Sequence, residues 1–263
     1  MDDLSSAELL YEVRDGIGHV TFNRPTARNA LTFGMYERLA ALCAEIDDDR
    51  SVRALVLTGA GGKAFAAGTD IALFQDFSGP EDALAYEARM ERVIGRLESC
   101  RVPTVAAIAG ACTGGGAVLA AACDLRLGAP NAVVGMPIAR TLGNCLSAAN
   151  LARLAALMGA ARVKEMIFKA ELMDASQALA AGFLNEIVPD GADLSDRAHQ
   201  FAVMVAAQAP LTLHATKEGL RRLGAAAARV PDEDLILSCY GSDDFREGIA
   251  AFLAKRRPVW RGR

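Results

Sequence analysis

The chain has 263 residues, of which 52% are apolar and 23% charged, with a formal net charge of −4 and a sequence pI near 5.5. The high apolar fraction and small net charge exclude a disordered chain, and the absence of a basic excess argues against a nucleic-acid-binding protein. The length suits one large domain, or one domain with a small appendage, and the 52 alanines and 24 glycines allow backbone segments to approach one another closely.

The first half of the chain alternates short apolar segments with helical ones. Residues 9–22 are predicted to form a hairpin around Asp15-Gly16, and Thr32 is predicted to cap a helix over residues 33–48. Since strands and helices go on alternating, we expect a mostly parallel sheet with right-handed crossovers. The remaining predictions in this half are helices over 81–98 and after residues 114–116, and strands over 54–57, 104–109, 124–128 and 132–134.

The second half is predicted to be mainly helical. Its apolar periodicity indicates one strand near residues 185–188 and helices over 146–158, 160–168, 191–208, 211–223, 231–239 and 242–254. We therefore predict an α/β core over residues 1–195 and a helical C-terminal segment over residues 196–263.

Three features of the sequence indicate in which cellular compartment the protein is found and whether it spans a membrane. Residues 102–123 are uncharged and long enough to span a bilayer, but Pro103, Gly110 and the glycines at 114–116 predict a strand, a loop and a helix instead. The first ten residues lack the layout of a signal peptide. The six cysteines show no metal-binding spacing, so we expect free thiols, no metal site and a cytoplasmic protein.

Two loops rich in glycine and alanine, residues 63–71 and 109–117, carry the strongest signal for chemistry. Each follows a buried strand and leads into a helix, an arrangement that directs free backbone N–H groups at one place. Two such N–H groups form an oxyanion hole, which stabilises negative charge on a thioester or ester oxygen. Taken singly, either loop is most simply a tight packing turn. A phosphate-binding loop is disfavoured because GxGxxG and GK[ST] patterns are missing.

Further motifs accompany the two loops along nearly the whole chain. Together with the loops they are Asn23-Arg24-Pro25, Asn29-Ala30-Leu31, residues 64–71, residues 114–116 with Cys123-Asp124, Arg246-Glu247-Gly248 and residues 252–256. In combination, these segments resemble the crotonase superfamily, also called the enoyl-CoA hydratase/isomerase superfamily. The resemblance implies a spiral of ββα units with a helical C-terminal trimerisation region, and an enzyme of fatty acid metabolism, a lyase or isomerase, that stabilises a thioester enolate.

The resemblance also implies a set of site residues. The N–H groups of Thr69 and Gly115 would hold the carbonyl oxygen of an acyl-CoA. It implies no cofactor besides the coenzyme A thioester that is the substrate, and a homotrimer or homohexamer with no nucleic-acid or membrane partner. The residues that would line the substrate path are Ala27, Arg28, Ala67, Asp70, Ile71, Ala72, Val118 and Ile138. Lys255 would reach the coenzyme A phosphates of a neighbouring subunit or, in the alternative interpretation, would lie at a solvated helix end.

The chain departs from the family at two positions. Hydratases of the family use two glutamates, because adding water needs an acid and a base. The first position is Val118, and the second falls on Ile138 or, in another register, on Ala139. Because neither position supplies a carboxylate, we do not expect standard hydration.

Arg140 and Asn144 are then the polar candidates for catalysis. An arginine at this place could bind a carboxylate on the acyl group, which favours decarboxylation of a carboxyacyl-CoA. The alternatives are an ion pair of Arg140 with Asp124 or Asp70, and a role for Asn144 as a helix cap.

Structural roles are expected for several other residues. We expect Asp70 to cap the helix that follows it, Cys145 to pack as a small apolar residue, and the three histidines to be structural. An alternative function is a non-catalytic acyl-CoA-binding or scaffold protein. An open, polar-lined pocket between Thr69, Gly115 and Ile138 would favour the enzyme, and a pocket filled by apolar side chains the scaffold.

Overall fold

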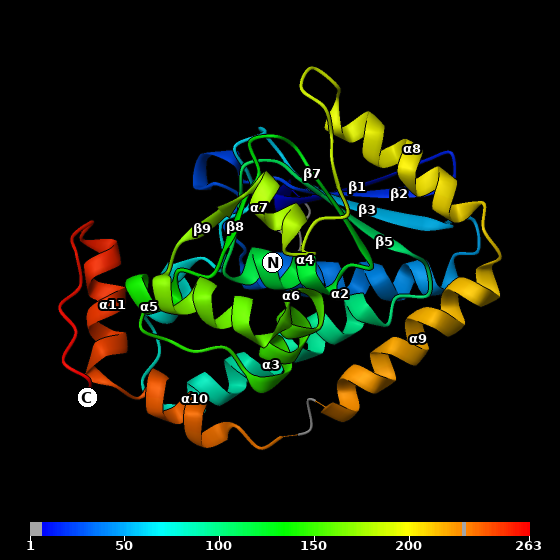
Figure 1. Ribbon diagram of the computed structural model, residues 1–263. Coiled ribbons are helices and arrows are strands. Elements are labelled where there is room, and N and C mark those ends of the chain that lie inside the picture. The colour runs from blue at the N-terminus through cyan, green and yellow to red at the C-terminus, as the bar shows by residue number, and fades with distance from the viewer. Residues whose placement is uncertain (1–6, 228–229) are drawn as a thin grey trace.

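The computed structural model describes residues 7–227 and 230–263, and in these residues it contains two sheets (Figure 1). In the larger sheet β1 runs antiparallel to β2 and the other neighbours are parallel. Its strands, in spatial order, are β1 (Leu9–Arg14), β2 (Ile17–Phe22), β3 (Ala54–Gly59), β5 (Thr104–Ile108), β7 (Leu125–Gly128) and β10 (Glu186–Ile187). The smaller sheet consists of β4 (Ala64–Ala66), β6 (Ala111–Thr113), β8 (Val133–Gly135) and β9 (Leu172–Asp174), with β9 antiparallel to β8.

Helices cover both faces of the larger sheet (Figure 1). Along β3, Ala54 and Val56 belong to the cluster that packs under α8, whereas Leu55 and Leu57 belong to the main core on the other face. This alternation explains why residues 54–57 of β3 are apolar at every position, as expected for a strand of a parallel sheet buried on both sides. The helices of the main core are α2 (Phe33–Asp48), α3 (Pro80–Glu98), α4 (Gly115–Ala122) and α6 (Ala148–Lys169).

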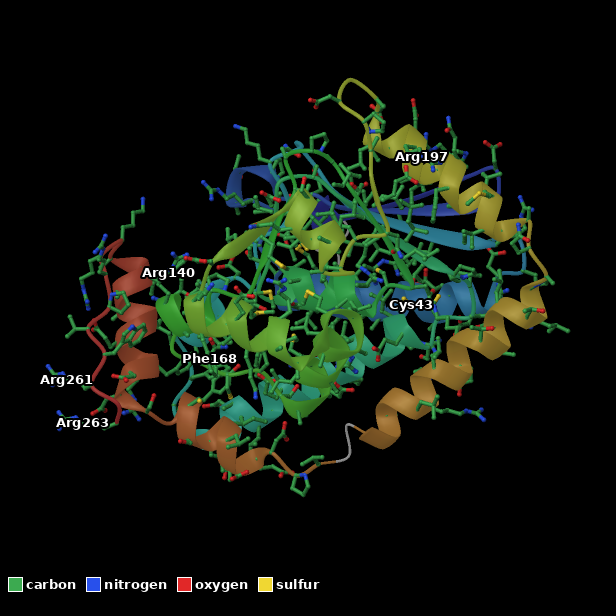
Figure 2. The ribbon with its side chains drawn as sticks, viewed as in Figure 1. Cys43, Arg140, Phe168, Arg197, Arg261 and Arg263 are labelled. Carbon is green, nitrogen blue, oxygen red and sulfur yellow. The ribbon has the colours of Figure 1, made fainter. Side chains whose placement is uncertain are left out.

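Helix α8 (Leu194–Ala206) covers the opposite face of the sheet. Figure 2 shows Arg197 on this helix, where its guanidinium lies 2.6 Å from the carboxylate of Glu186 on the edge strand β10. The predicted domain boundary after residue 195 therefore falls within a helix that belongs to the layers of the sheet. The division of the chain into two parts stays a prediction.

The predicted N-terminal elements are confirmed. Strands β1 and β2 pair around Asp15-Gly16, and α2 begins at Phe33, where the Thr32 hydroxyl accepts a hydrogen bond from the Met35 N–H at 3.3 Å. Residues 102–123 contain the predicted strand β5 and the predicted helix α4, with the short strand β6 where a loop was predicted. In the part of the chain that the structure describes no helix is long and apolar enough to cross a membrane.

The smaller sheet was not predicted. Its strands β4 and β6 lie within the two Gly/Ala-rich segments, which we expected to be loops, and β9 and the helix α7 (Ala175–Ala180) lie in a segment without a prediction. Three-residue strands made largely of alanine carry little β-propensity, so the expectation of plain loops was wrong for β4 and β6. The predicted break between helices over 146–158 and 160–168 is confirmed, because Gly159, whose φ is +75°, divides the segment labelled α6 into two helical parts.

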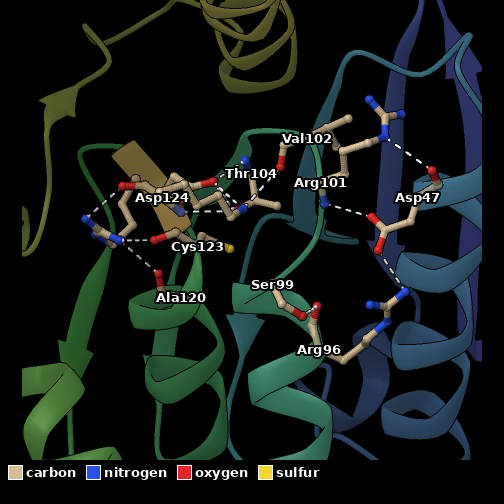
Figure 3. A network of polar contacts seen from close by, with 11 residues as sticks. Asp47, Arg96, Ser99, Arg101, Val102, Thr104, Ala120, Cys123 and Asp124 are labelled. Atoms are coloured by element: carbon tan, nitrogen blue, oxygen red, sulfur yellow. Dashed lines mark hydrogen bonds and ion pairs between the residues drawn. The ribbon is translucent and has the colours of Figure 1, made fainter. Parts of the chain in front are cut away.

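Polar contacts fix the beginning of β5 (Figure 3). Asp124 Oδ2 accepts hydrogen bonds from the N–H and the hydroxyl of Thr104, at 2.7 and 2.9 Å, and Asp47 accepts one from the Arg101 N–H at 2.7 Å. Lys217 Nζ lies 2.7 Å from the same Asp124 oxygen. The cation beside Asp124 is thus Lys217, and the suggested ion pair with Arg140 is wrong.

The C-terminal helices complete the fold. Helix α9 (Pro210–Ala227) contacts α6, and α10 (Glu233–Tyr240) packs against α3. Helix α11 (Asp243–Leu253) packs against two short helices, α5 (Ile138–Thr141) and η2 (Ile71–Phe74). The short helix η1 (Pro25–Ala27) follows β2. Helices α10 and α11 thereby close one side of the cavity described next.

Candidate active site

A cavity of about 490 Å³ lies where the two Gly/Ala-rich loops meet the helices α3, α5 and α10. This volume is within the range of small-molecule sites. The predicted site residues that line it are Ala27, Arg28, Ala67, Thr69, Asp70, Ile71, Gly115, Val118, Ile138 and Asn144.

Two backbone N–H groups on the cavity wall are left without a backbone acceptor. Leu31 forms a parallel bridge with Thr69, in which the Leu31 N–H donates to the Gly68 carbonyl and the Leu31 carbonyl accepts from the Asp70 N–H. In such a bridge the N–H of the middle residue, Thr69, points away from Leu31. Gly115 is the first residue of α4, and the first N–H groups of a helix have no partner within it. The Thr69 and Gly115 N–H groups are therefore available to a ligand.

Close packing brings these two groups together. A Cβ atom on Gly115 would lie 3.4 Å from the Thr69 nitrogen and 2.4 Å from the Tyr36 hydroxyl oxygen, and one on Gly116 would lie 2.1 Å from the Ala66 carbonyl oxygen. Only glycine fits at such distances. The beginning of α4 can approach the first loop so closely because the sequence has glycine at both positions.

The Thr69 hydroxyl is held by two tyrosines. Its oxygen lies 3.0 Å from the hydroxyl oxygens of both Tyr36 and Tyr86. Burial raises the pKa of both phenols above their usual value, so both stay neutral at physiological pH. These contacts hold the Thr69 backbone, and with it the free N–H group, in one orientation.

The two positions where the family resemblance implies glutamates are apolar and face the cavity. Val118 and Ile138 are buried and line it, together with Phe74, Met90 and Ile94. Ala139 is exposed and does not line it. Of the two registers considered from the sequence, the structure therefore places Ile138 at the cavity.

A carboxyl group nevertheless lines the cavity, from a different element. Glu87 of α3 is only 8% exposed, and its Oε1 accepts a hydrogen bond of 2.7 Å from the Tyr240 hydroxyl of α10. Burial raises the pKa of Glu87 to about 7. The bond from Tyr240 acts to lower it, and the charges of Asp232 and Glu91 act to raise it.

Sequence reasoning missed Glu87, although a signal was present. Along α3 the buried positions recur at helical spacing, and Glu87 occupies one of them in the series Ala83, Glu87, Met90, Ile94, Leu97. A carboxylate on the apolar face of a helix is unusual, because burying a charge is costly. That exception points to a functional group.

Asn144 belongs to the same polar cluster as Glu87 and Tyr240. Its Nδ2 donates a hydrogen bond of 3.2 Å to the Tyr240 hydroxyl. Its Oδ1 is, within the described ranges, the one buried side-chain nitrogen or oxygen without a hydrogen-bond partner. The suggested helix cap was wrong, because α6 is capped by Ser147, whose hydroxyl accepts from the Asn150 N–H.

Three predicted site residues lie outside the cavity. Arg140 is exposed and, at the end of α5 beside α11, lines a separate hollow with Arg256, Arg257 and Trp260 (Figure 2). Ala72 and Lys255 are exposed and do not line the main cavity. The suggested ion pair of Arg140 with Asp70 was also wrong, because Arg24 occupies Asp70 at 3.0 Å.

Several structural expectations are confirmed. Asp70 caps η2, with its Oδ1 accepting from the Ala72 N–H at 3.2 Å. Cys145 packs beside the apolar cluster around Tyr240. His19 and His199 contact each other through ring nitrogens 3.1 Å apart, away from the cavity, and burial lowers the pKa of His19 to about 4.

Comparisons with known proteins place this geometry in a family. The family model described as enoyl-CoA hydratase/isomerase matches residues 12–263. A probable enoyl-CoA hydratase of Mycobacterium tuberculosis is 32% identical over 95% of this chain and 96% of its own length. The solved enoyl-CoA hydratase/carnithine racemase of Magnetospirillum magneticum is 34% identical over 97% and 96% of the two chains, with a TM-score of 0.79.

A methylmalonyl-CoA decarboxylase, solved in complex with 2-nitronate-propionyl-CoA, is 28% identical over 97% of this chain and 99% of its own, with a TM-score of 0.88. Its fold matches over nearly the whole length of both chains. The chain therefore belongs to the enoyl-CoA hydratase/isomerase family and has the crotonase fold.

Proposed function

We propose that the cavity binds an acyl-CoA thioester with its carbonyl oxygen between the N–H groups of Thr69 and Gly115. The observation that carries this proposal is the meeting of two unpartnered N–H groups at one cavity wall. Negative charge that develops on the thioester oxygen is stabilised there, so an enolate forms at lower cost. The relatives named for enoyl-CoA and methylmalonyl-CoA support a coenzyme A thioester as the substrate.

The reaction we propose is not a standard two-glutamate hydration. Val118 and Ile138 stand where the resemblance implies the two glutamates, and neither can carry a proton. The coenzyme A portion of the substrate would be held by four other residues that line the cavity, Ala27, Arg28, Ala67 and Ile71. Apart from this thioester, we propose no cofactor.

A non-catalytic acyl-CoA-binding protein is the alternative. The cavity is open rather than filled, and Glu87, Asn144 and Tyr240 add polar groups to its wall, which favours an enzyme. Decarboxylation of a carboxyacyl-CoA remains a second candidate reaction, favoured by the end-to-end match to methylmalonyl-CoA decarboxylase. Arg140 no longer supports it, because this side chain lies outside the cavity.

The test is a substrate panel. Purified protein is incubated with crotonyl-CoA, malonyl-CoA, methylmalonyl-CoA and saturated acyl-CoAs, and the products are measured by mass spectrometry. We expect enolate chemistry on at least one thioester and slow hydration of crotonyl-CoA. Fast hydration of crotonyl-CoA would contradict the proposed departure from hydration. Tight binding without turnover of any thioester would favour the scaffold.

We propose in addition that the chain forms a homotrimer or homohexamer. Helix α9 exposes Leu211, Leu220 and Leu223, whose exposed fractions are 82%, 65% and 70%. Exposed leucines gathered on one helix favour a contact between subunits. Light scattering after size-exclusion chromatography should give a mass of three or six chains, and a monomer would contradict the proposal.

A further inference from the structure

Glu87 has no structural need to be a carboxylic acid. Its Oε1 accepts a hydrogen bond from the Tyr240 hydroxyl, and the Ser147 hydroxyl also acts on the carboxyl group as a donor. A glutamine oxygen could accept either bond equally well. Among the described residues, no ion pair involves Glu87. A buried, unpaired carboxyl is costly, and such groups occur where ionisation is used.

The surroundings of Glu87 leave it able to change its charge. The groups that act on it are the phenol of Tyr240, the Ser147 hydroxyl, and the carboxylates of Glu91 and Asp232. Glu91 is neutralised by Arg153, whose Nη2 lies 2.6 Å from it. With a pKa raised to about 7, Glu87 is present near neutral pH both as an acid and as a base, which is the condition for efficient proton transfer.

A second polar side chain lies in this part of the cavity. Asn144 lines the same cavity as Glu87, and within the described ranges its Oδ1 is a buried acceptor without a hydrogen-bond partner. An unsatisfied amide is costly to bury, as an unpaired carboxyl group is, so two unfavourable polar groups are gathered at one wall of the cavity. The Glu87–Tyr240–Asn144 chain thus lines the space that a ligand would occupy.

The cavity also joins Glu87 to the two free N–H groups. Thr69 and Gly115 line the same cavity as Glu87. The Thr69 hydroxyl is also hydrogen-bonded to the hydroxyl of Tyr86, the residue that precedes Glu87 on α3. The negative charge of Glu87 also contributes to the raised pKa of both Tyr36 and Tyr86, although burial is the larger cause. The carboxyl group and the N–H groups therefore lie on the wall of one cavity, where a single ligand can contact both.

We propose that Glu87 is the acid–base residue of this cavity, exchanging a proton with the acyl carbon next to the thioester carbonyl. The inference rests on the proposed acyl-CoA function. In the forward step, the C–H bond breaks and its electron pair forms the enolate C=C bond. The carbonyl π pair moves onto the oxygen held by the Thr69 and Gly115 N–H groups, and the proton passes to Glu87. In the reverse step, the Glu87 acid returns a proton to the same carbon.

The test uses butyryl-CoA, whose saturated chain can neither be hydrated nor lose carbon dioxide. The full-length protein is incubated with it in D₂O, and deuterium at the carbon next to the carbonyl is measured by mass spectrometry. We expect E87Q to slow the exchange by about 10²–10⁴-fold, with the Kd for butyryl-CoA changed less than about threefold. Glu81→Gln, an exposed glutamate in the first turn of the same helix, is the matched control and should exchange as the wild type does.

The pH profile separates a proton-transfer role from a positioning role. Exchange by the wild type should rise with pH through a midpoint near 7 and then level off, because the carboxylate is the base. E87Q should lose this midpoint. E87D keeps the carboxyl but shortens the side chain, so it should retain a midpoint at a rate lowered about tenfold. This variant also serves as the test if E87Q fails to fold, as judged by circular dichroism.

The outcomes separate this role from the proposed function. Exchange by the wild type that survives unchanged in E87Q would overturn the role of Glu87 and leave the acyl-CoA function standing. Absence of exchange in the wild type, despite binding of butyryl-CoA, would overturn the enolate function and with it the role of Glu87.

Discussion

The two walls of the cavity offer different chemical groups to a ligand. The loop wall, residues 67–71 and 113–118, offers backbone N–H groups held by close packing of glycine and alanine. The helical wall offers the side chains of Glu87, Asn144 and Tyr240, from three segments far apart in the sequence. The loop wall can stabilise charge and the helical wall can move a proton, so an enolate needs both. The following predictions test this division.

The largest effect is expected in the loop wall. Gly115→Ala would place a methyl group 2.4 Å from the Tyr36 hydroxyl oxygen and beside the Thr69 nitrogen, so the two N–H groups would no longer converge. We expect the deuterium exchange of butyryl-CoA to fall by about 10²–10³-fold, the usual cost of losing an oxyanion donor. Gly95→Ala is the control, because a Cβ on Gly95 has open space around it. An unchanged rate in Gly115→Ala would argue against the loop wall as the site of charge stabilisation.

The second-largest effect is expected in the helical wall, where Glu87 makes the folding stability of the protein depend on pH. The pKa of Glu87 is about 7 in the folded protein, against 4.5 for an ordinary glutamate, so the unfolded chain ionises first as the pH rises. Folding stability is therefore lost between about pH 4.5 and 7, by about 3 kcal/mol in all. E87Q should unfold at higher urea concentration than the wild type at pH 8, and the gain should be much smaller at pH 5.

Glu81→Gln provides the comparison for this measurement, since Glu81 is exposed. Its effect on the urea midpoint should be small and equal at the two pH values. An E87Q gain of the same size at pH 5 and pH 8 would mean that Glu87 ionises as an ordinary surface glutamate does.

A smaller effect is expected from the hydroxyl of Tyr240. Tyr240→Phe keeps the ring, which packs 4.8 Å from Phe245, but removes the hydrogen bond that favours the charged form of Glu87. The pH midpoint of exchange should therefore move upward by about one unit. Tyr11→Phe, on strand β1 outside the cavity, should leave the midpoint in place. A midpoint that stays the same in Tyr240→Phe would separate Tyr240 from the proton-transfer group.

The smallest effect is expected at Arg140. Because its side chain is exposed and lines a separate hollow, Arg140→Gln should change turnover of any thioester in the panel less than about twofold. Arg28 lines the cavity, so Arg28→Gln should raise the KM for the same thioester more than Arg140→Gln does. A selective loss of decarboxylation in Arg140→Gln would restore the carboxylate-binding role that the sequence favoured.

Sequence alone determined the elements whose signals are local. The Asp15-Gly16 turn, the Thr32 cap and the continuous apolar strands predicted the hairpin, α2 and the parallel sheet, and the structure has all of them. The loop wall could also be predicted from the sequence, because glycines between a strand and a helix indicate a tight turn that leaves backbone N–H groups free. Motif spacing pointed to Val118 and to either Ile138 or Ala139, and the structure places Val118 and Ile138 at the cavity.

Only the tertiary structure decided the helical wall. Residues 87, 144 and 240 are brought together because α10 packs on α3 and Asn144, in the segment before α6, bonds to Tyr240 of α10, and no local pattern specifies that packing. The same holds for Arg140, which the sequence placed at the site but the turn of α5 directs outward. Local propensity fixes backbone geometry within a few residues, whereas the pKa and the partners of a side chain depend on what packing buries beside it.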